Sequence, residues 1–265
     1  MDTMKYYVVS DIHSFYSILI KTLEEKGFFA DTEPHKLVIC GDLFDRGKEA
    51  LKIQAFILEL MQKDEVILIR GNHEDLLLSM LDDMASGIPV LYSYHRDNGT
   101  VDTVKQLLKK GTHWFDSEPD VVISQMRSSP ILRTIIPAMK NYFETKNYIF
   151  VHGWIPCHAT KITRNIYQYA PMEDWRNASE KQWDEARWIN GMEAAYNGIT
   201  ETEKTIVCGH WHTSFGHAKY EGKGTEKGAD ADLSTYYANG IIALDACTSY
   251  SKKINCIVIE DEPLD

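Results

Sequence analysis

At residues 41–47 the chain reads Gly-Asp-Leu-Phe-Asp-Arg-Gly, directly after the apolar run Leu-Val-Ile-Cys at residues 37–40. The apolar run predicts a buried strand, and the glycines at both ends of the next stretch predict a tight turn. The turn offers Asp42 and Asp45 as metal ligands or orienting carboxylates, and Arg46 as a planar fork for phosphate. An acidic surface turn with an ion pair fits the same residues, so the neighbouring segments decide between the two interpretations.

The same order of strand, polar loop and helix occurs three times near the N-terminus. Apolar runs end at residues 9, 40 and 69, polar clusters follow each of them, and helical periodicity then covers residues 16–26, 48–62 and 76–81. Repeated strand-loop-helix units predict a parallel sheet. In such sheets the polar chemistry gathers beyond the carboxyl ends of the strands, and this is where the clusters lie.

The remaining chain is predicted to complete one domain covering residues 1–265. Residues 82–140 lack strand patterns and predict a helical insertion, and a further helix is expected at 179–188. Strands are expected at residues 141–144, 148–151 and 205–208, and the runs at 241–244 and 254–259 predict a closing strand pair. The glycines and charges of residues 221–232 predict a loop.

Composition excludes several classes of protein. The net charge of −11 argues against nucleic acid or an anionic membrane as the main partner, because both favour basic surfaces. No apolar run approaches the roughly 20 residues that span a bilayer. The five cysteines occur singly, without the paired spacing of zinc or redox motifs, and indicate reduced thiols. We therefore expect a cytoplasmic protein with no membrane partner and no stable nucleic-acid binding.

Five strand ends carry side chains that can bind metal ions: Asp11 and His13, Asp42, Asn72 and His73, His152, and His210 and His212. Each histidine alone fits a structural hydrogen-bonding role, but the series indicates a metal site. Carboxylate, amide and imidazole ligands together suit manganese, iron or zinc better than magnesium or calcium.

These ligands are numerous enough for two ions. Asp42 can bridge them, with Asp11, His13 and His212 on one ion and Asn72, His152 and His210 on the other. Two ions about 3.5–4 Å apart can share a hydroxide that attacks phosphorus.

Five sequence blocks, taken in order, resemble the calcineurin-like metallophosphoesterase superfamily: Asp11-x-His13, Gly41-Asp42, Gly71-Asn72-His73-Glu74, His152, and Gly209-His210-Trp211-His212. Residues 41–47 resemble its phosphoprotein-phosphatase branch, which includes serine/threonine phosphatases, their bacterial and phage relatives, and diadenosine tetraphosphate hydrolases. Residues 97–100, Asp-Asn-Gly-Thr, are loosely similar to an asparagine-glycine block of the bacterial members. The resemblance implies an α/β fold of four layers, with two mixed sheets flanked by helices, and two divalent ions, manganese first and iron or zinc as alternatives.

The resemblance also implies roles for individual residues. His73 would be the general acid, Asp45 would orient its ring, and Arg46 would bind the phosphoryl group, with Asn72 beside the substrate and Arg187 as a second phosphate clamp. The expected activity is hydrolysis of phosphate monoesters of the serine/threonine phosphatase type, on a phosphoprotein or a nucleotide polyphosphate. A diadenosine tetraphosphatase or other phosphodiesterase is the alternative, and a non-catalytic metal-binding scaffold is a third hypothesis.

Overall fold

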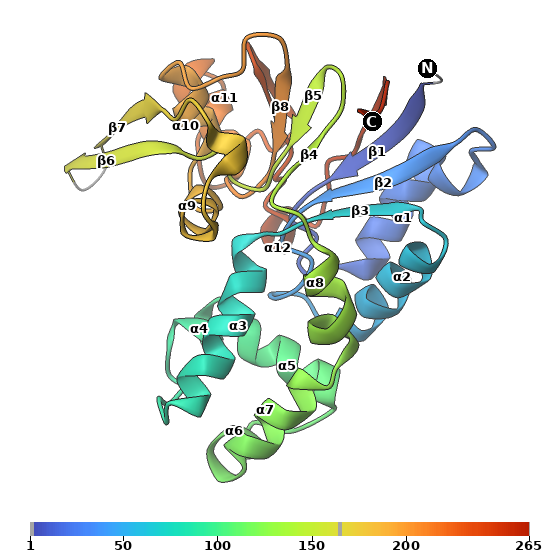
Figure 1. The fold of residues 1–265 in the computed structure, drawn as a ribbon, viewed down its shortest axis with the longest axis vertical. Coiled ribbons are helices and arrows are strands. Elements are labelled where there is room, and N and C mark those ends of the chain that lie inside the picture. Colours follow the sequence, from blue (N-terminus) through green and yellow to red (C-terminus); the bar gives the residue numbers. More distant parts are fainter. Residues whose placement is uncertain (1–2, 164–165, 265) are drawn as a thin grey trace.

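The parallel strands predicted near the N-terminus form the first of two sheets in the structure, a computed structural model that describes residues 3–163 and 166–264 (Figure 1). This first sheet has the strand order β11-β1-β2-β3. Its strands are β1 (Met4–Val9), β2 (His35–Cys40), β3 (Val66–Ile69) and β11 (Ile257–Asp261). The first three are parallel, and β11 pairs with β1 in the antiparallel sense.

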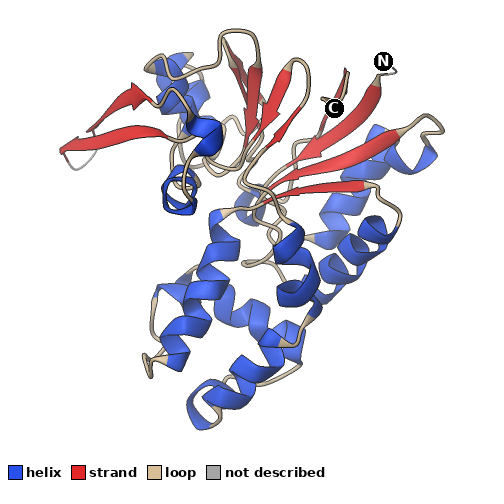
Figure 2. Cartoon of the chain, viewed as in Figure 1, coloured by secondary structure: helices blue, strands red, loops and turns tan. Residues whose placement is uncertain are grey.

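The second sheet has the order β4-β5-β8-β10-β9, with parallel strands in its centre and antiparallel strands at its edges. Its strands are β4 (Phe143–Glu144), β5 (Tyr148–Phe150), β8 (Thr205–Cys208), β9 (Tyr236–Ala238) and β10 (Ile241–Ala243). A separate hairpin joins β6 (Cys157–Thr163) to β7 (Ile166–Pro171). The predicted α/β class, with two mixed sheets flanked by helices, is confirmed (Figure 2).

The two sheets share a core because side chains alternate between the faces of each strand. Val38 of β2, and Phe150 and Val207 of the second sheet, belong to one buried cluster between the sheets. Leu37 and Ile39, the neighbours of Val38, instead belong to the cluster under the helices. Strands buried on both faces read as continuous apolar runs, which is the pattern of residues 37–40.

Helices cover the outer faces of both sheets. The first sheet carries α1 (Tyr16–Lys26), α2 (Ala50–Gln62) and α3 (Asn72–Ala85). The helical insertion then adds α4 (Tyr94–Asp97), α5 (Thr100–Leu108), α6 (His113–Ser117), α7 (Pro119–Arg127), a π-helical turn (Ile131–Ile135) and α8 (Ile136–Ala138). Side chains of the insertion belong to the same hydrophobic cluster as α1 and α2.

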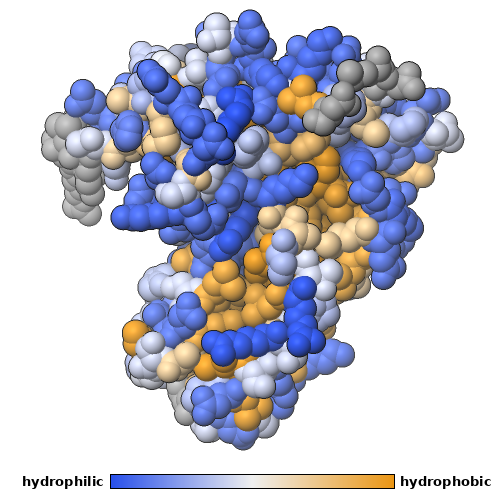
Figure 3. Space-filling view, in the orientation of Figure 1, coloured by the Kyte–Doolittle hydropathy of each residue, from blue (hydrophilic) through white to orange (hydrophobic). Residues whose placement is uncertain are grey.

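The second sheet is covered by α9 (Glu180–Ala186), α10 (Gly191–Tyr196) and α11 (Ser214–Tyr220). Short elements complete the chain: 3-10 turns at Phe28–Ala30 and Trp175–Asn177, and α12 (Thr248–Ser251). On the face seen in Figure 3, hydrophobic residues gather over the helical insertion and beside the first sheet. No helix in the described ranges is both long and apolar enough to cross a membrane.

Two expectations about the C-terminal half are wrong. The runs at 241–244 and 254–259 do not pair with each other, because β10 joins β8 and β9 whereas β11 crosses to β1. The stretch before residue 202 also contains the β6–β7 hairpin, which sequence reasoning missed. Its strands read His-Ala-Thr-Lys and Tyr-Gln-Tyr-Ala, too polar to signal a buried strand.

The shared core generates a stability prediction. Phe150 is fully buried between the sheets, and its ring centroid lies 5.6 Å from that of Phe143 and 6.2 Å from that of Tyr6. Phe150→Ala should lower the free energy of unfolding by about 3–5 kcal/mol because it opens a cavity. Urea unfolding followed by circular dichroism measures this loss. Tyr92→Ala, at a ring that is 88% exposed, should change stability by less than about 0.5 kcal/mol. Equal effects of the two changes would contradict the shared core.

Candidate active site

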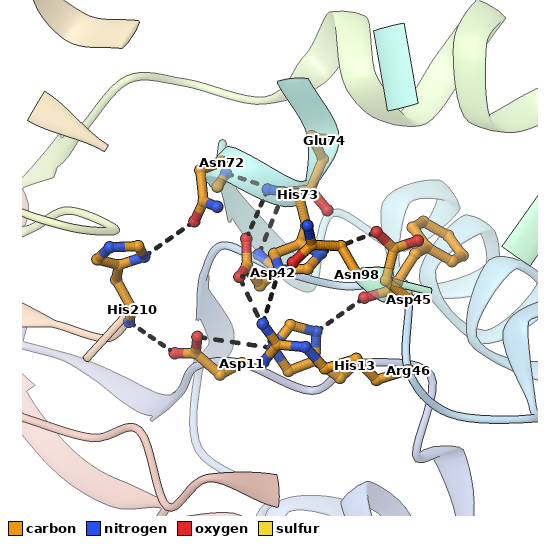
Figure 4. A network of polar contacts seen from close by, with 12 residues as sticks. Asp11, His13, Asp42, Asp45, Arg46, Asn72, His73, Glu74, Asn98 and His210 are labelled. Atoms are coloured by element: carbon orange, nitrogen blue, oxygen red, sulfur yellow. Dashed lines mark hydrogen bonds and ion pairs between the residues drawn. The ribbon is translucent and has the colours of Figure 1, made fainter. Parts of the chain in front are cut away.

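The ends of strands from both sheets meet at Asp42 (Figure 4). Asp11 and His13 follow β1, Asp42 follows β2, and Asn72 begins α3 just after β3. His152 follows β5 and His210 follows β8 in the second sheet. Backbone hydrogen bonds connect the first two loops, since the amides of Asp11 and His13 donate to the carbonyls of Gly41 and Asp42 at 3.2 and 3.0 Å.

The backbone of these loops adopts the left-handed conformation at several side-chain-bearing residues. The φ angles of Asp11, His13, Asp42 and His210 are 51°, 48°, 56° and 67°. Such φ angles are uncommon outside glycine and are typical of functional sites, where surrounding contacts hold them in place. Gly41 has a φ of 82°, and a Cβ there would collide with the ring of His152.

Glu74 fixes the turn that carries Asp42. Its side chain is buried, and its carboxylate accepts hydrogen bonds from the backbone amides of Gly71, Asp42 and Leu43 at 2.8, 3.1 and 3.0 Å. The amide of His73 in turn donates to Oδ1 of Asp42 at 3.0 Å. The turn after β2 and the first turn of α3 are therefore held as one unit.

Two groups of side chains in the described part of the chain could each hold a metal ion, and Asp42 belongs to both. One group is His13, Asp42 and His73, and the other is Asp11, Asp42 and His152. Asn72 lies beside the second group, because its Oδ1 is 2.8 Å from Nε2 of His152 and 2.9 Å from Nδ1 of His210.

The donor set fits a cation at this place. Nδ1 of His152 contacts the carbonyl of Cys40 at 2.8 Å, so a neutral His152 ring would hold its proton on Nδ1 and its lone pair on Nε2. That lone pair faces two oxygens, Oδ1 of Asn72 at 2.8 Å and Oδ1 of Asp42 at 3.3 Å. In the neutral form of the ring three acceptors face one another, and a divalent cation between them would satisfy all three.

Electrostatics lead to the same conclusion. Burial, with Asp11 and Glu74 nearby, holds the pKa of Asp42 well above its usual range, although His73 opposes the shift. Burial and the charge of Arg46 hold the pKa of His13 well below its usual value, so this ring is neutral. Nδ1 of His13 contacts the carbonyl of Phe44 at 2.9 Å, which leaves the lone pair on Nε2, the form that binds metal. A divalent ion would compensate the buried carboxylates.

Arg46, Asp45 and His73 form a connected group at the edge of this centre. The guanidinium of Arg46 donates to Nε2 of His13 at 2.9 Å and to Nε2 of His73 at 3.0 Å. Nδ1 of His73 donates to Oδ2 of Asp45 at 2.8 Å. Burial disfavours a charged ring, but Asp42 and Asp45 outweigh it and raise the pKa of His73.

Two residues of the helical insertion, which sequence reasoning did not single out, hold Asp45. The hydroxyls of Thr100 and Thr103 donate to its two carboxylate oxygens at 2.8 and 2.7 Å. Gly99 has a φ of 92° and packs so closely on Arg46 that a Cβ would collide with the backbone there. The block Asp97-Asn98-Gly99-Thr100 therefore lies against the site. Its resemblance to an asparagine-glycine block of bacterial relatives was the sequence feature that could have pointed to Thr100.

Asp245 is a second missed residue. It follows β10, is 6% exposed, and accepts a hydrogen bond from the amide of Cys247 at 2.7 Å. Burial holds its pKa well above the usual range, and the charge of Asp11 adds to the shift. The rule that polar residues follow strand ends could have found it, because it comes directly after the apolar run 241–244.

Two predicted residues lie apart from this centre. His212 contacts Glu226 of the 221–232 loop, with 3.5 Å between Nε2 and Oε1, and belongs to neither metal-capable group. Arg187 donates to Asp75 at 2.6 Å, to Asn141 at 2.8 Å and to Glu180 at 2.9 Å. These acceptors use all three guanidinium nitrogens, and Arg70 also pairs with Asp75. The metal role of His212 and the phosphate role of Arg187 stay predictions.

Glu74 generates a testable prediction. In Glu74→Gln, an amide NH2 replaces one acceptor oxygen and faces a backbone N–H, which should destabilise the fold by about 1–3 kcal/mol. Because the turn carries Asp42, manganese affinity should fall by about ten- to a hundredfold. Urea unfolding and manganese titration by calorimetry measure the two effects. Glu59→Gln, at an exposed helix position paired with Lys63, serves as the control. Unchanged manganese affinity in Glu74→Gln would contradict the role of Glu74.

Known proteins are similar to parts of this chain in sequence. The Calcineurin-like phosphoesterase family profile matches residues 4–221. Serine/threonine-protein phosphatase 1 of Salmonella typhimurium is 40% identical over 72 residues, which cover 27% of this chain and 31% of that protein. The asymmetrical bis(5'-nucleosyl)-tetraphosphatase PrpE of Bacillus velezensis is 32% identical over 76 residues, which cover 26% of this chain and 30% of that protein.

Both alignments thus span less than a third of each relative. The crystal structure of a cold-active protein tyrosine phosphatase from a psychrophilic Shewanella species is 18% identical, with a TM-score of 0.49, and covers 97% of this chain and 77% of that chain. Because the family profile extends over well more than half of the sequence, the chain belongs to the calcineurin-like phosphoesterase family.

Proposed function

We propose that this protein is a metal-dependent phosphatase that hydrolyses phosphate monoesters at the site around Asp42. One observation carries the proposal: Asp42 belongs to two metal-capable groups that also contain Asp11, His13 and His152, and the guanidinium of Arg46 lies against His13 and His73. We assign His73, the remaining member of these groups, to proton transfer and not to metal binding. The residues that would hold divalent ions are Asp11, His13, Asp42, Asn72, His152 and His210, with His212 as a further predicted ligand. Manganese is the metal that we expect, and iron or zinc would suit the same ligands.

Divalent ions bound at this site would neutralise phosphoryl charge and lower the pKa of water. The protein's own residues then have separate tasks. Arg46 has two N–H groups directed to one side, and these can bind two phosphoryl oxygens in place of the histidine nitrogens. The charge of Arg46 would stabilise the negative charge of the transition state.

His73 is suited to protonate the leaving group. Its Nδ1–H is held by Asp45, so Nε2, once Arg46 donates to phosphate in its place, is the nitrogen that can carry a proton to the leaving oxygen. As water oxygen bonds to phosphorus, the bond from phosphorus to the leaving oxygen breaks and that oxygen takes the proton. Asp45, fixed by Thr100 and Thr103, keeps the ring in the required orientation.

The relatives suggest two substrate types, a serine/threonine phosphoprotein and a dinucleoside tetraphosphate. Manganese-loaded protein should release phosphate or nucleotide from p-nitrophenyl phosphate, a phosphoserine peptide or diadenosine tetraphosphate, and the relative rates identify the type. Bis-p-nitrophenyl phosphate, hydrolysed faster than the monoester, would indicate a phosphodiesterase. Absence of metal-dependent turnover on every substrate would contradict the proposal and favour a metal-binding scaffold. A cytoplasmic location stays a prediction.

Replacing the arginine fork generates the first functional prediction. Arg46→Lys keeps the charge but loses the paired donors, and Arg46→Ala loses both. We expect kcat for p-nitrophenyl phosphate to fall by about 100-fold or more in Arg46→Ala, and by less in Arg46→Lys. Arg127→Lys, at an exposed position of α7, is the matched control and should keep wild-type kcat. Wild-type turnover by Arg46→Ala would exclude a role for this fork.

The second functional prediction concerns the leaving group. His73→Asn should slow hydrolysis of a phosphoserine peptide by about 10²–10⁴, because a serine alkoxide needs a proton as it leaves. The loss with p-nitrophenyl phosphate should be smaller, since p-nitrophenolate leaves without protonation. The ratio of kcat values for the two substrates measures the effect. Equal losses on both substrates would assign His73 to metal or phosphate binding instead.

A further inference from the structure

An aromatic groove of about 780 Å³ opens beside the proposed active site. Five rings line it: Tyr167 and Tyr169 of β7, Trp188 between α9 and α10, Trp211 after β8, and Phe215 of α11. The elements that carry these rings gather on one side of the molecule, around the β6–β7 hairpin (Figure 1). The volume lies within the range of about 300–1,000 Å³ found for small-molecule sites.

The groove adjoins the strand-end centre through His210. The ring centroid of Trp188 lies 5.8 Å from that of His210, and the centroid of Trp211 lies 5.9 Å from it. His210 in turn contacts Asn72 at the centre. A phosphate bound there would place the adjoining part of its molecule next to Trp188.

Trp188 is the most exposed of these rings, ahead of Tyr167 at 39%. The rings of Tyr169, Trp211 and Phe215 pack against the hydrophobic cluster of the second sheet, whereas Trp188 is 50% exposed. An exposed indole beside a site is a platform on which a flat ring of a ligand can stack. A second cleft, which Trp188 also lines, contains five acids, Asp75, Asp82, Asp83, Glu180 and Asp184, and three basic residues, Arg70, Lys181 and Arg187.

The groove also offers polar groups that a heterocycle could use. The indole Nε1 of Trp211 is buried and has no hydrogen-bond partner within residues 3–163 and 166–264. A buried donor without an acceptor is unfavourable, and a ring nitrogen or carbonyl of a ligand would supply the acceptor. The carboxylate of Glu193, on the same wall, accepts from Tyr169 at 3.0 Å and from Lys219 at 3.0 Å. A plain phenyl ring has no acceptor for Trp211.

We propose that this groove is a nucleobase subsite, and that the ligand of the protein is a nucleotide whose phosphate lies at the Asp42 centre and whose base stacks on Trp188. The inference rests on the proposed function for the position of the phosphate. It extends that function by naming the residues that would select a nucleotide over other phosphate esters.

The experiment compares the binding of AMP and ribose 5-phosphate to the manganese-loaded protein by calorimetry, with both ligands used as phosphonate analogues in which a CH2 group replaces the ester oxygen and prevents hydrolysis. The two ligands share the sugar and phosphate, so the ratio of their dissociation constants reports the base alone. Stacking on one aromatic residue should make AMP bind at least about tenfold tighter than ribose 5-phosphate. Trp188→Ala should remove most of this ratio, Trp188→Phe should retain most of it, and Tyr92→Ala, at an exposed ring in the helical insertion, should keep it in full.

Several outcomes would overturn the subsite. Equal affinities for AMP and ribose 5-phosphate would exclude it, and so would a ratio that Trp188→Ala leaves unchanged. The affinity ratio of phosphotyrosine to phosphoserine provides a further comparison. If it is as large as the ratio of AMP to ribose 5-phosphate, the groove binds aromatic rings in general and is not a nucleobase site. Failure of the proposed function would give a different result from failure of the subsite. If the proposed function is wrong, neither ligand will bind in a metal-dependent manner.

Discussion

The buried carboxylate of Glu74 is the constraint on which the rest of the site depends. It accepts three backbone amides from two loops and so holds the turn after β2 against the first turn of α3. Asp42 on that turn is the residue that both metal-capable groups share. Its left-handed backbone would be unfavourable in isolation, and the surrounding hydrogen bonds maintain it. The turn that carries Asp42 thus depends on a side chain that belongs to neither metal-capable group.

The packing of the two sheets explains why side chains distant in sequence meet at Asp42. Tyr6 and Val38 of the first sheet and Phe150 and Val207 of the second belong to one buried cluster, which aligns the carboxyl ends of their parallel strands. His152 and His210 are therefore presented to the loops that carry Asp11 and Asp42. The helical insertion completes the arrangement from the other side, since Thr100 and Thr103 fix Asp45, which holds the ring of His73.

Sequence reasoning predicted the parts of this molecule that follow from local pattern. The continuous apolar run at residues 37–40 is a strand buried on both faces, and the polar residues after it lie at the site, as expected. Strand pairing in the C-terminal half was not predictable, because short apolar runs such as 241–244 do not encode which neighbour they join. Thr100 lay in the block 97–100 that resembled the bacterial relatives but was given no role, and Thr103 was missed because an ordinary helix residue carries no signal of a distant carboxylate. Arg187 was singled out by family resemblance, yet its guanidinium is paired with Asp75, Asn141 and Glu180.

The central proposal is that Asp42 would be the ligand shared by two divalent ions. Anomalous diffraction from crystals of the manganese-loaded protein, recorded near the manganese absorption edge, tests it most directly. The account predicts two anomalous peaks on opposite sides of the Asp42 carboxylate, one near Asp11 and His13 and the other near Asn72 and His152. A single peak, or peaks away from Asp42, would contradict it.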